Sequence, residues 1–319
     1  MELIRKDVLL SEIRSEDETF RLSCGSLENR ELIDSICEFG LLHPILLRKT
    51  TNGYQILSGF KRNHAFVVLK KPAILATIFP FETTDIVCIK AILQDISLPI
   101  SIFATSKILT LLENASSSSE EFLSLTKKLL KISSPHIIQE YKIFSALSSE
   151  LQFFVKEGGL SLSILPLFIQ KVEPAFQIQL ATLFHELKLS FQKQREIITY
   201  LYELSIIEET SMQSIFELDE IKPILEDSTL DRGLKASQLR TFLKKKRYPT
   251  ISHMEENFKQ QLKQLGFPSD IQLSPPENFE GDTFRVQFIS KNLKEFQTTA
   301  KTLQKISQNP KLAQLFRKF

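Results

Sequence analysis

The chain has 319 residues, of which 42% are hydrophobic and 24% charged, so it holds enough apolar material for two or three folded domains. It contains no apolar run of about 18 residues, which excludes a membrane-spanning helix, and its charged N-terminal stretch is unlike a signal peptide. The formal net charge of +2 favours no class of partner, and three cysteines without metal-ligand spacing favour a reducing cytoplasm over a disulfide framework.

Residues 1–97 mix strand and helix signals. Residues 28–40 carry apolar positions at helical spacing and end in Gly40, which predicts an amphipathic helix with a glycine C-cap. Residues 44–59 read as a hairpin around the turn signal TNG, and a short helix and a strand at 73–79 follow. The preceding stretch EDETFRLSC ends in a short β-like run. These short alternating elements predict an α+β domain.

The rest of the chain is predicted to be mainly helical. Residues 98–186 show 3.6-residue periodicity throughout and form an all-α middle domain, and residues 187–247 continue it as a helical region. Residues 248–319 read as a small α+β module of helix, loop, strand and helix, in which alternating phenylalanine and valine mark the strand.

Charge is concentrated at the junction of the last two parts. Residues 187–230 hold 4 basic and 9 acidic side chains, whereas residues 231–319 hold 17 basic and 8 acidic ones. The densest cations lie in residues 231–247, which read as a basic helix with Leu239, Phe242 and Leu243 on its buried side. The helix predicts either phosphate contacts with nucleic acid or ion pairs with the acidic segment of its own chain.

One ordered pattern in residues 26–79 resembles the N-terminal domain of the ParB family of chromosome and plasmid partition proteins. The pattern is a helix ending in Gly40, a strand after Pro44, a turn, the strand YQILSG, and then GFKRNHA, which is similar to the family's G-E-R-R-x-R-A motif. An apolar strand follows at the family's spacing. The resemblance extends more weakly to about residue 186.

The resemblance implies a site for CTP with Mg²⁺ at the start of the helix after Gly59. The residues carried over as nucleotide and phosphate contacts are Arg21, Gly59, Lys61, Arg62 and His64. Phe60 replaces the motif's acidic residue. It also excludes sulfiredoxin activity on this fold, because that chemistry needs a cysteine directly after the glycine. The family's E-N-x-Q-R signature falls on 94–98, where Asp95 is the implied metal ligand and Ser97 and Leu98 replace glutamine and arginine.

The resemblance also implies DNA as a partner, read through a degenerate helix-turn-helix over residues 123–147. The contacts expected on the second helix and on the basic connector are Ser133, Ser134, His136, Gln139, Lys142, Arg240, Lys244, Lys245, Lys246 and Arg247. A helical spacer that no longer reads DNA is equally compatible with this segment, because it contains Glu140 and lies in a region of slight negative charge.

Three functions are therefore compatible with the sequence. The first is a bacterial, cytoplasmic and nucleoid-associated ParB-like DNA-binding protein in partition or transcriptional regulation, with CTP-dependent switching and a homodimer formed through the C-terminal module. The second is a nucleotide-dependent enzyme on the same scaffold, a phosphotransferase or a weak CTPase. The third is a non-catalytic adaptor that has lost both activities.

Overall fold

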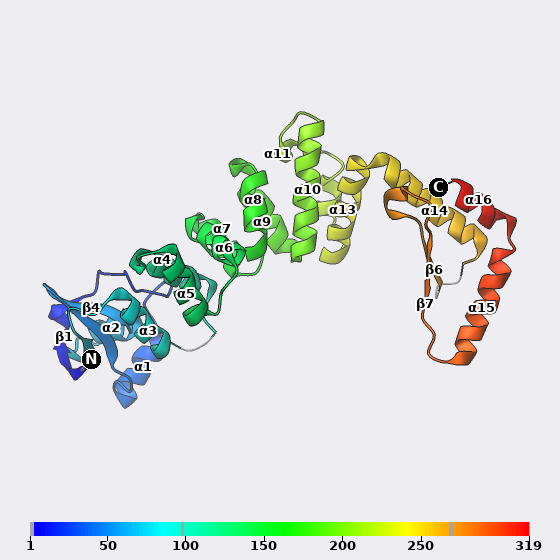
Figure 1. Cartoon of the computed structure of the whole chain (residues 1–319). Coiled ribbons are helices and arrows are strands. Elements are labelled where there is room, and N and C mark those ends of the chain that lie inside the picture. Colours follow the sequence, from blue (N-terminus) through cyan, green and yellow to red (C-terminus); the bar gives the residue numbers. More distant parts are fainter. Residues whose placement is uncertain (1–2, 97–98, 268–270, 319) are drawn as a thin grey trace. The chain divides into compact units, whose positions relative to one another are not determined.

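The computed structural model describes residues 3–96, 99–267 and 271–318, and its contacts divide the chain into two units (Figure 1). Unit 1 comprises residues 1–170 and 177–191, and unit 2 comprises residues 171–176 and 192–319. The finer division at 97, 186 and 247 stays a prediction.

Unit 1 begins with a mixed five-stranded sheet in the order β1-β5-β3-β4-β2. Its strands are β1 (Ile4–Leu9), β2 (Ile13–Arg14), β3 (Ile45–Thr50), β4 (Gly53–Ser58) and β5 (Ala73–Phe79). β3 and β4 form the predicted antiparallel hairpin, and β5 pairs antiparallel with β1 and parallel with β3. The α+β prediction for this domain is confirmed.

Three helices flank the sheet. They are α1 (Arg30–Phe39), α2 (Phe60–Val68) and α3 (Asp85–Asp95). Asn29 caps α1 by accepting a hydrogen bond from the backbone N–H of Leu32 at 3.0 Å, and Gly40 ends the helix at φ 73°. The predicted β-like run at Arg21–Cys24 is wrong, because this segment is an irregular strap whose Arg21 side chain donates to the carbonyl oxygen of Gly25.

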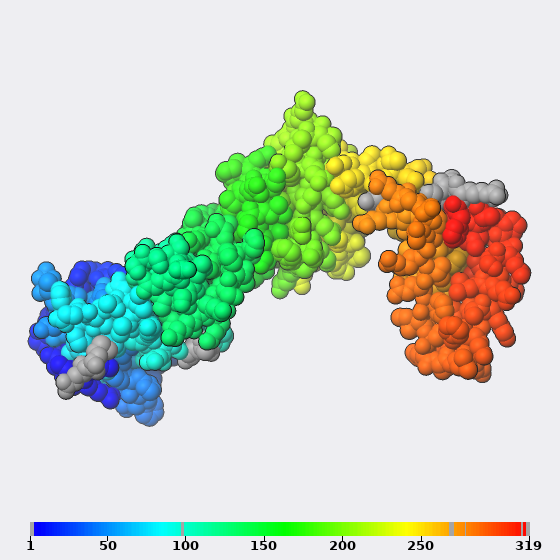
Figure 2. All heavy atoms as spheres, in the orientation of Figure 1, coloured from blue at the N-terminus to red at the C-terminus, as the bar shows by residue number. Residues whose placement is uncertain are grey.

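The helical part of unit 1 follows the sheet domain. Its helices are α4 (Ile102–Ala115), α5 (Ser119–Leu130), α6 (Pro135–Ala146), α7 (Ser149–Lys156) and α8 (Leu165–Lys171), whose last residue belongs to unit 2. α9 (Pro174–Leu187) begins in unit 2 and continues into unit 1. Serine side chains cap α4, α5 and α7, and Pro135 stands in the first turn of α6, as the sequence favours. α4 packs against α5 and α6, and Figure 2 shows their surfaces merging without a gap.

Unit 2 contains a helical portion and a small α+β module. Its further elements are α10 (Phe191–Ile207, which starts at the end of unit 1), α11 (Met212–Phe216), α12 (Lys222–Glu226), α13 (Arg232–Arg247), α14 (Pro249–Leu265), β6 (Ile271–Ser274), β7 (Arg285–Phe288), α15 (Leu293–Ser307) and α16 (Pro310–Lys318). β6 and β7 pair antiparallel, so the strand predicted near residue 286 has a partner that the sequence pattern did not indicate. A core around Phe258, Leu273 and Leu315 holds the module together.

Candidate nucleotide and nucleic-acid sites

The turn between β4 and α2 places the first group of candidate residues. β4 ends at Ser58, Gly59 takes φ 102°, and α2 begins at Phe60. A Cβ atom at position 59 would lie 2.5 Å from Cγ2 of the fully buried Ile45. Glycine is therefore required here by backbone conformation and by packing, independently of any ligand.

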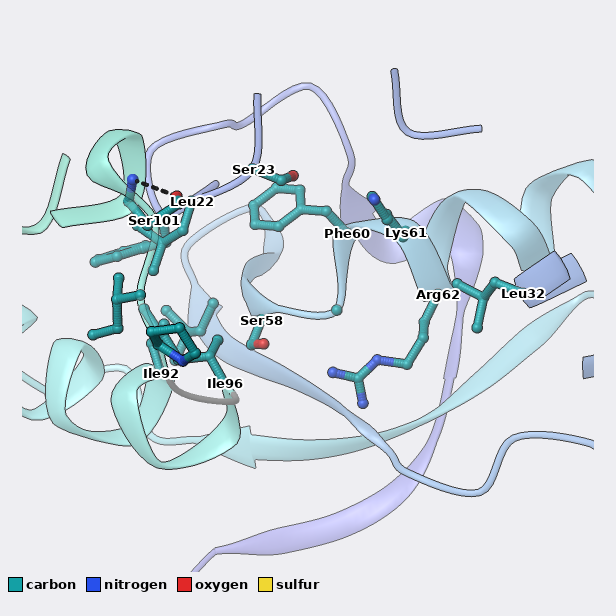
Figure 3. Close-up of a pocket in the computed structure, with 16 residues that line it drawn as sticks. Leu22, Ser23, Leu32, Ser58, Phe60, Lys61, Arg62, Ile92, Ile96 and Ser101 are labelled. Carbon is teal, nitrogen blue, oxygen red and sulfur yellow. Dashed lines mark hydrogen bonds between the residues drawn. The ribbon is translucent and has the colours of Figure 1, made fainter. Parts of the chain in front are cut away.

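A cavity of about 630 Å³ opens beside this turn, and we call it the α2 cavity (Figure 3). Its walls are mainly apolar, with polar groups where β4 meets α2. The residues from this turn that line it are Ser58, Gly59, Phe60, Lys61 and Arg62, and the apolar walls include Leu22, Leu57, Ile92, Ile96 and Ile100. A volume of this size is typical of a small-molecule site.

The structure brings together only some of the residues predicted to contact nucleotide. Gly59, Lys61 and Arg62 line the α2 cavity, and Figure 3 shows the amino group of Lys61 directed away from the Arg62 guanidinium. Arg21 lies between Phe20 and Leu22, which line the cavity, but its guanidinium is bound to Glu18 and to the Gly25 carbonyl. His64 does not line the cavity.

Arg62 is held in place by three acceptors. Its Nη1 donates to the carbonyl oxygens of His43 at 3.0 Å and Pro44 at 2.9 Å, and its Nη2 lies 2.9 Å from Oδ2 of Asp95. The Ser58 hydroxyl donates to the same Oδ2. The side chains of Arg62 and Asp95 are only 19% and 22% exposed, so solvent screens their ion pair less than it would a surface pair. Ser58 is a site residue that the sequence analysis missed.

The residues around Asp95 fit Mg²⁺ poorly. Its carboxylate oxygen Oδ2 already accepts hydrogen bonds from the Ser58 hydroxyl and the Arg62 guanidinium. The positive charge of Arg62 would also repel a metal cation bound at the same oxygen. Within the described part of the chain, no three His, Cys, Asp or Glu side chains group as a metal site would require. Ser97 and Leu98, which the family signature singled out, lie outside the described residues. The Asp95 carboxylate is therefore better suited to its two hydrogen-bond donors than to a metal ion.

The candidate helix-turn-helix corresponds to α5, a turn at residues 131–134, and α6. Ser133 is exposed in the turn, and His136 and Gln139 are exposed in the first half of α6, as base contacts would need to be. Ser134 is the N-cap residue of α6 and is partly buried. Lys142 instead turns toward α4, where its Nζ lies 2.6 Å from a carboxylate oxygen of Glu113.

A second hollow of about 520 Å³, which we call the lysine hollow, lies where α5 ends. It is lined by Ser124, Lys127, Lys128, Lys131 and Ser133, all exposed. Among the described residues, none of the three lysines forms an ion pair with a carboxylate. Lys127 and Lys128 also complement the negative end of the α5 dipole, which by itself accounts for their presence in the last turn. The signal was present in the sequence, since residues 122–139 hold these three lysines and no acidic residue.

The basic helix α13 is a different kind of surface, because the five cations of its second half are paired with carboxylates within unit 2. The pairs are Arg240 with Glu196, Lys244 with Glu255 at 2.7 Å, Lys245 with Glu256 at 2.5 Å, Lys246 with Glu208 at 3.0 Å, and Arg247 with Glu203 at 2.6 Å. Leu239 and Leu243 are fully buried on its other side, as expected, whereas Phe242, predicted with them, is only partly buried. Three of the five acids lie in residues 187–230, as the intramolecular alternative of the sequence analysis expects, whereas Glu255 and Glu256 belong to α14.

Two of these pairs fix the alignment of α13 along α10. Glu196 and Glu203 are seven residues apart, as are Arg240 and Arg247, so the two helices run in the same direction side by side (Figure 1). Tyr248 donates its hydroxyl to Glu203 at 3.0 Å. Burial raises the pKa of Tyr248 and the Glu203 carboxylate raises it further, so this hydroxyl keeps its proton at neutral pH. The acidic segment and the basic helix thus fold onto each other.

Comparison with known proteins gives one family match. Residues 3–93 match the model of the ParB N-terminal domain, which confirms the resemblance over the first domain. A comparison with curated proteins finds no match. No helix in the described ranges is both long and apolar enough to cross a membrane.

Among solved structures, the chain is similar to a C-terminally truncated chromosome-partitioning protein ParB from Caulobacter crescentus complexed with CTP-γ-S. The identity is 19% and the TM-score 0.26, over 57% of this chain and 98% of that one. It is also similar to the same protein complexed to the centromeric parS site, at 16% identity and TM-score 0.35 over 61% and 98% of the two chains. A third similar structure is a Pnob8-like ParB-N domain, at 13% identity and TM-score 0.35 over 62% and 91%.

Proposed function

We propose that this chain, whose residues 3–93 match the ParB N-terminal domain, is a DNA-binding protein of the partition type that holds duplex phosphates in the lysine hollow. The observation that carries the proposal is the set of three lysines, Lys127, Lys128 and Lys131, without carboxylate partners among the described residues. Ammonium groups free of intramolecular acids can neutralise phosphates and release condensed counterions on binding. Exposed Ser133, His136 and Gln139 stand beside them, at the start of the helix that would read bases.

The cations at the end of α13 are less suited to bind DNA phosphates than the lysines of the lysine hollow. Each cation of residues 244–247 has a carboxylate partner, so binding a phosphate there requires an ion pair to be broken first. The partly buried contacts of Arg247 with Glu203 make this exchange least favourable at the end of the helix.

The experiment is a salt titration of duplex binding by the full chain and by two triple variants of equal charge. The binding constant K falls as salt rises, with a slope of log K against log salt of roughly −0.9 per phosphate contact. Removing three contacts should therefore make this slope less steep by about 2.7. We expect this change for Lys127/Lys128/Lys131→Ala. The matched control, Lys244/Lys245/Lys246→Ala, loses the same three charges from paired lysines and keeps a near-normal slope. The proposal would be contradicted if the control variant lost more of its salt dependence than Lys127/Lys128/Lys131→Ala does, or if the intact chain did not bind duplex.

A nucleotide ligand in the α2 cavity is the second candidate function. It is favoured by an open cavity of about 630 Å³ at a strand–glycine–helix turn, with Lys61 exposed at its edge and Arg62 in its wall. CTP is the ligand that the family resemblance implies, and it would act as a switch or as a hydrolysed substrate. Equilibrium binding of CTP, with and without Mg²⁺, to the wild type and to Arg62→Ala tests it. Absence of CTP binding by the wild type would contradict it.

We also propose that the C-terminal module joins two copies of the chain. Large apolar side chains stand exposed around β7 and α15, among them Ile289 at 84% and Leu293 at 71%. Val286 and Phe296 extend the same exposed set to both elements. Light scattering should give a dimer mass for the wild type and a monomer mass for Leu293→Glu. Equal masses for the two proteins would refute this interface.

A further inference from the structure

Asp95 occupies a position that an anionic ligand would need. It is the last residue of α3, and its Oδ2 is bound by the Ser58 hydroxyl and by Nη2 of Arg62, which flank Gly59 on the two sides of the β4–α2 turn. A hydroxyl and a guanidinium converging on one oxygen form a site for an oxyanion, with charge-assisted hydrogen bonds. The group that fills it here is a carboxylate of the chain itself, 33 residues from Arg62.

The receiving groups are prearranged. Nη1 of Arg62 is fixed by the carbonyl oxygens of His43 and Pro44, which leaves Nη2 directed at Asp95. The guanidinium therefore keeps its position whether or not the carboxylate is present. Such a prearranged donor favours whichever anion is presented to it.

The ion pair also lies between two hollows. The α2 cavity is lined by Ser58 and Arg62, and a smaller hollow of about 360 Å³ is lined by Arg62 and Asp95 together with Ser35 and His43. Arg62 and Leu32 are common to both hollows. An anionic ligand that enters the α2 cavity consequently meets an arginine whose charge is already balanced from the other side.

We propose that Asp95 is an intrachain competitor, and that a phosphate-bearing ligand binds Ser58 and Arg62 by displacing its carboxylate. The proposal rests on the ligand site put forward as the second candidate function. Displacement frees the C-terminal turn of α3 from Ser58 and Arg62. Because α3 packs against α4 and β4, ligand binding would change the contacts of the helical part of unit 1. If Asp95 were instead a ligand of Mg²⁺, loss of its charge would weaken the binding of CTP with Mg²⁺.

The test compares Asp95→Asn with Asp85→Asn in the full chain. Asp85 is the first residue of the same helix and also pairs with an arginine, Arg48 at 2.6 Å, so it matches the change in charge away from the site. Calorimetric titration uses inorganic pyrophosphate in EDTA, followed by CTP in EDTA and CTP with Mg²⁺. We expect Asp95→Asn to bind pyrophosphate roughly tenfold more tightly than the wild type, as loss of one charge-assisted contact to a competing group predicts. Asp85→Asn should bind as the wild type does.

Each outcome decides between the possibilities. Equal or weaker pyrophosphate binding by Asp95→Asn overturns the competitor and leaves the ligand site standing. Loss of affinity confined to CTP with Mg²⁺ assigns Asp95 to the metal instead. Absence of binding by the wild type and by Asp95→Asn overturns both the competitor and the ligand site, while the salt titration of DNA binding is unaffected. If Asp95→Asn does not fold, hydrogen exchange of the wild type decides, because saturating pyrophosphate should speed exchange in the last turn of α3, and unchanged or slower exchange refutes displacement.

Discussion

Replacement of Arg48 by methionine should loosen residues 17–20, which contribute Phe20 to the wall of the α2 cavity. Arg48 donates to the side-chain oxygen of Gln55 from Nε at 3.1 Å and from Nη2 at 2.6 Å, and from Nη1 to Asp85 and to the Thr83 carbonyl. Gln55 in turn donates to Asp17 at 2.9 Å, and the Arg48 guanidinium covers the ring of Phe20, a residue of the cavity wall. Methionine keeps the apolar stem and removes every one of these donors.

The cost follows from the acceptor left behind. Gln55 is only 6% exposed, and a buried acceptor without a partner costs about 1–3 kcal/mol. Loss of the Asp85 pair adds little, because that carboxylate is 45% exposed. The expected destabilisation is thus about 1–3 kcal/mol, and for a unit of this size each kcal/mol lowers the melting temperature by roughly 2–4 °C.

Scanning calorimetry of the full chain measures this effect. The matched control is Lys49→Met, which removes one cation from the neighbouring, exposed position of the same strand. We expect a clear shift for Arg48→Met and almost none for Lys49→Met. Equal melting curves for the two variants would refute the proposed role of the network.

Two further predictions concern Gly59 and the cysteines. Gly59→Ala should destabilise the chain by at least about 2 kcal/mol, from a backbone at φ 102° and a Cβ 2.5 Å from Ile45. Gly25→Ala, with φ 85° and open space around it, should cost less in the same denaturant titration, and equal costs would disprove the packing argument. Burial raises the pKa of Cys88 to about 11, so its thiol stays protonated and unreactive at pH 8. A thiol-reactive dye should therefore label exposed Cys24 and Cys37 in the native chain and reach Cys88 only after unfolding; rapid labelling of all three would contradict this.

Local chemistry in the sequence was sufficient to predict much of the N-terminal domain. Gly40 ends α1 and the TNG turn joins β3 to β4, both as expected, because caps and tight turns depend on neighbouring residues. β1 was missed for the opposite reason. Only Val8 of its six residues is buried, so the strand shows no alternation and exists through its pairing with β5, about 70 residues away.

The candidate sites show the same limit. Gly59, Lys61 and Arg62 were found because they lie in one short motif, GFKRNHA, whereas the contact of Arg62 with Asp95 joins positions 33 residues apart. For Arg240 and Arg247 the sequence indicated an acidic segment and no individual partner, since each meets an acid 44 residues earlier. The partners of Lys244 and Lys245, on α14, were not predicted. Pairing over such distances is decided by how helices pack, and no local pattern specifies it.

Hydrogen exchange of the full chain with and without a DNA duplex tests the proposed DNA contact most directly, since it locates the residues that the duplex covers. We predict that duplex slows exchange at the end of α5 and the start of α6, over residues 124–139, and leaves α13 unchanged. Slower exchange in α13 with none in residues 124–139 would contradict the assignment of DNA binding to the lysine hollow.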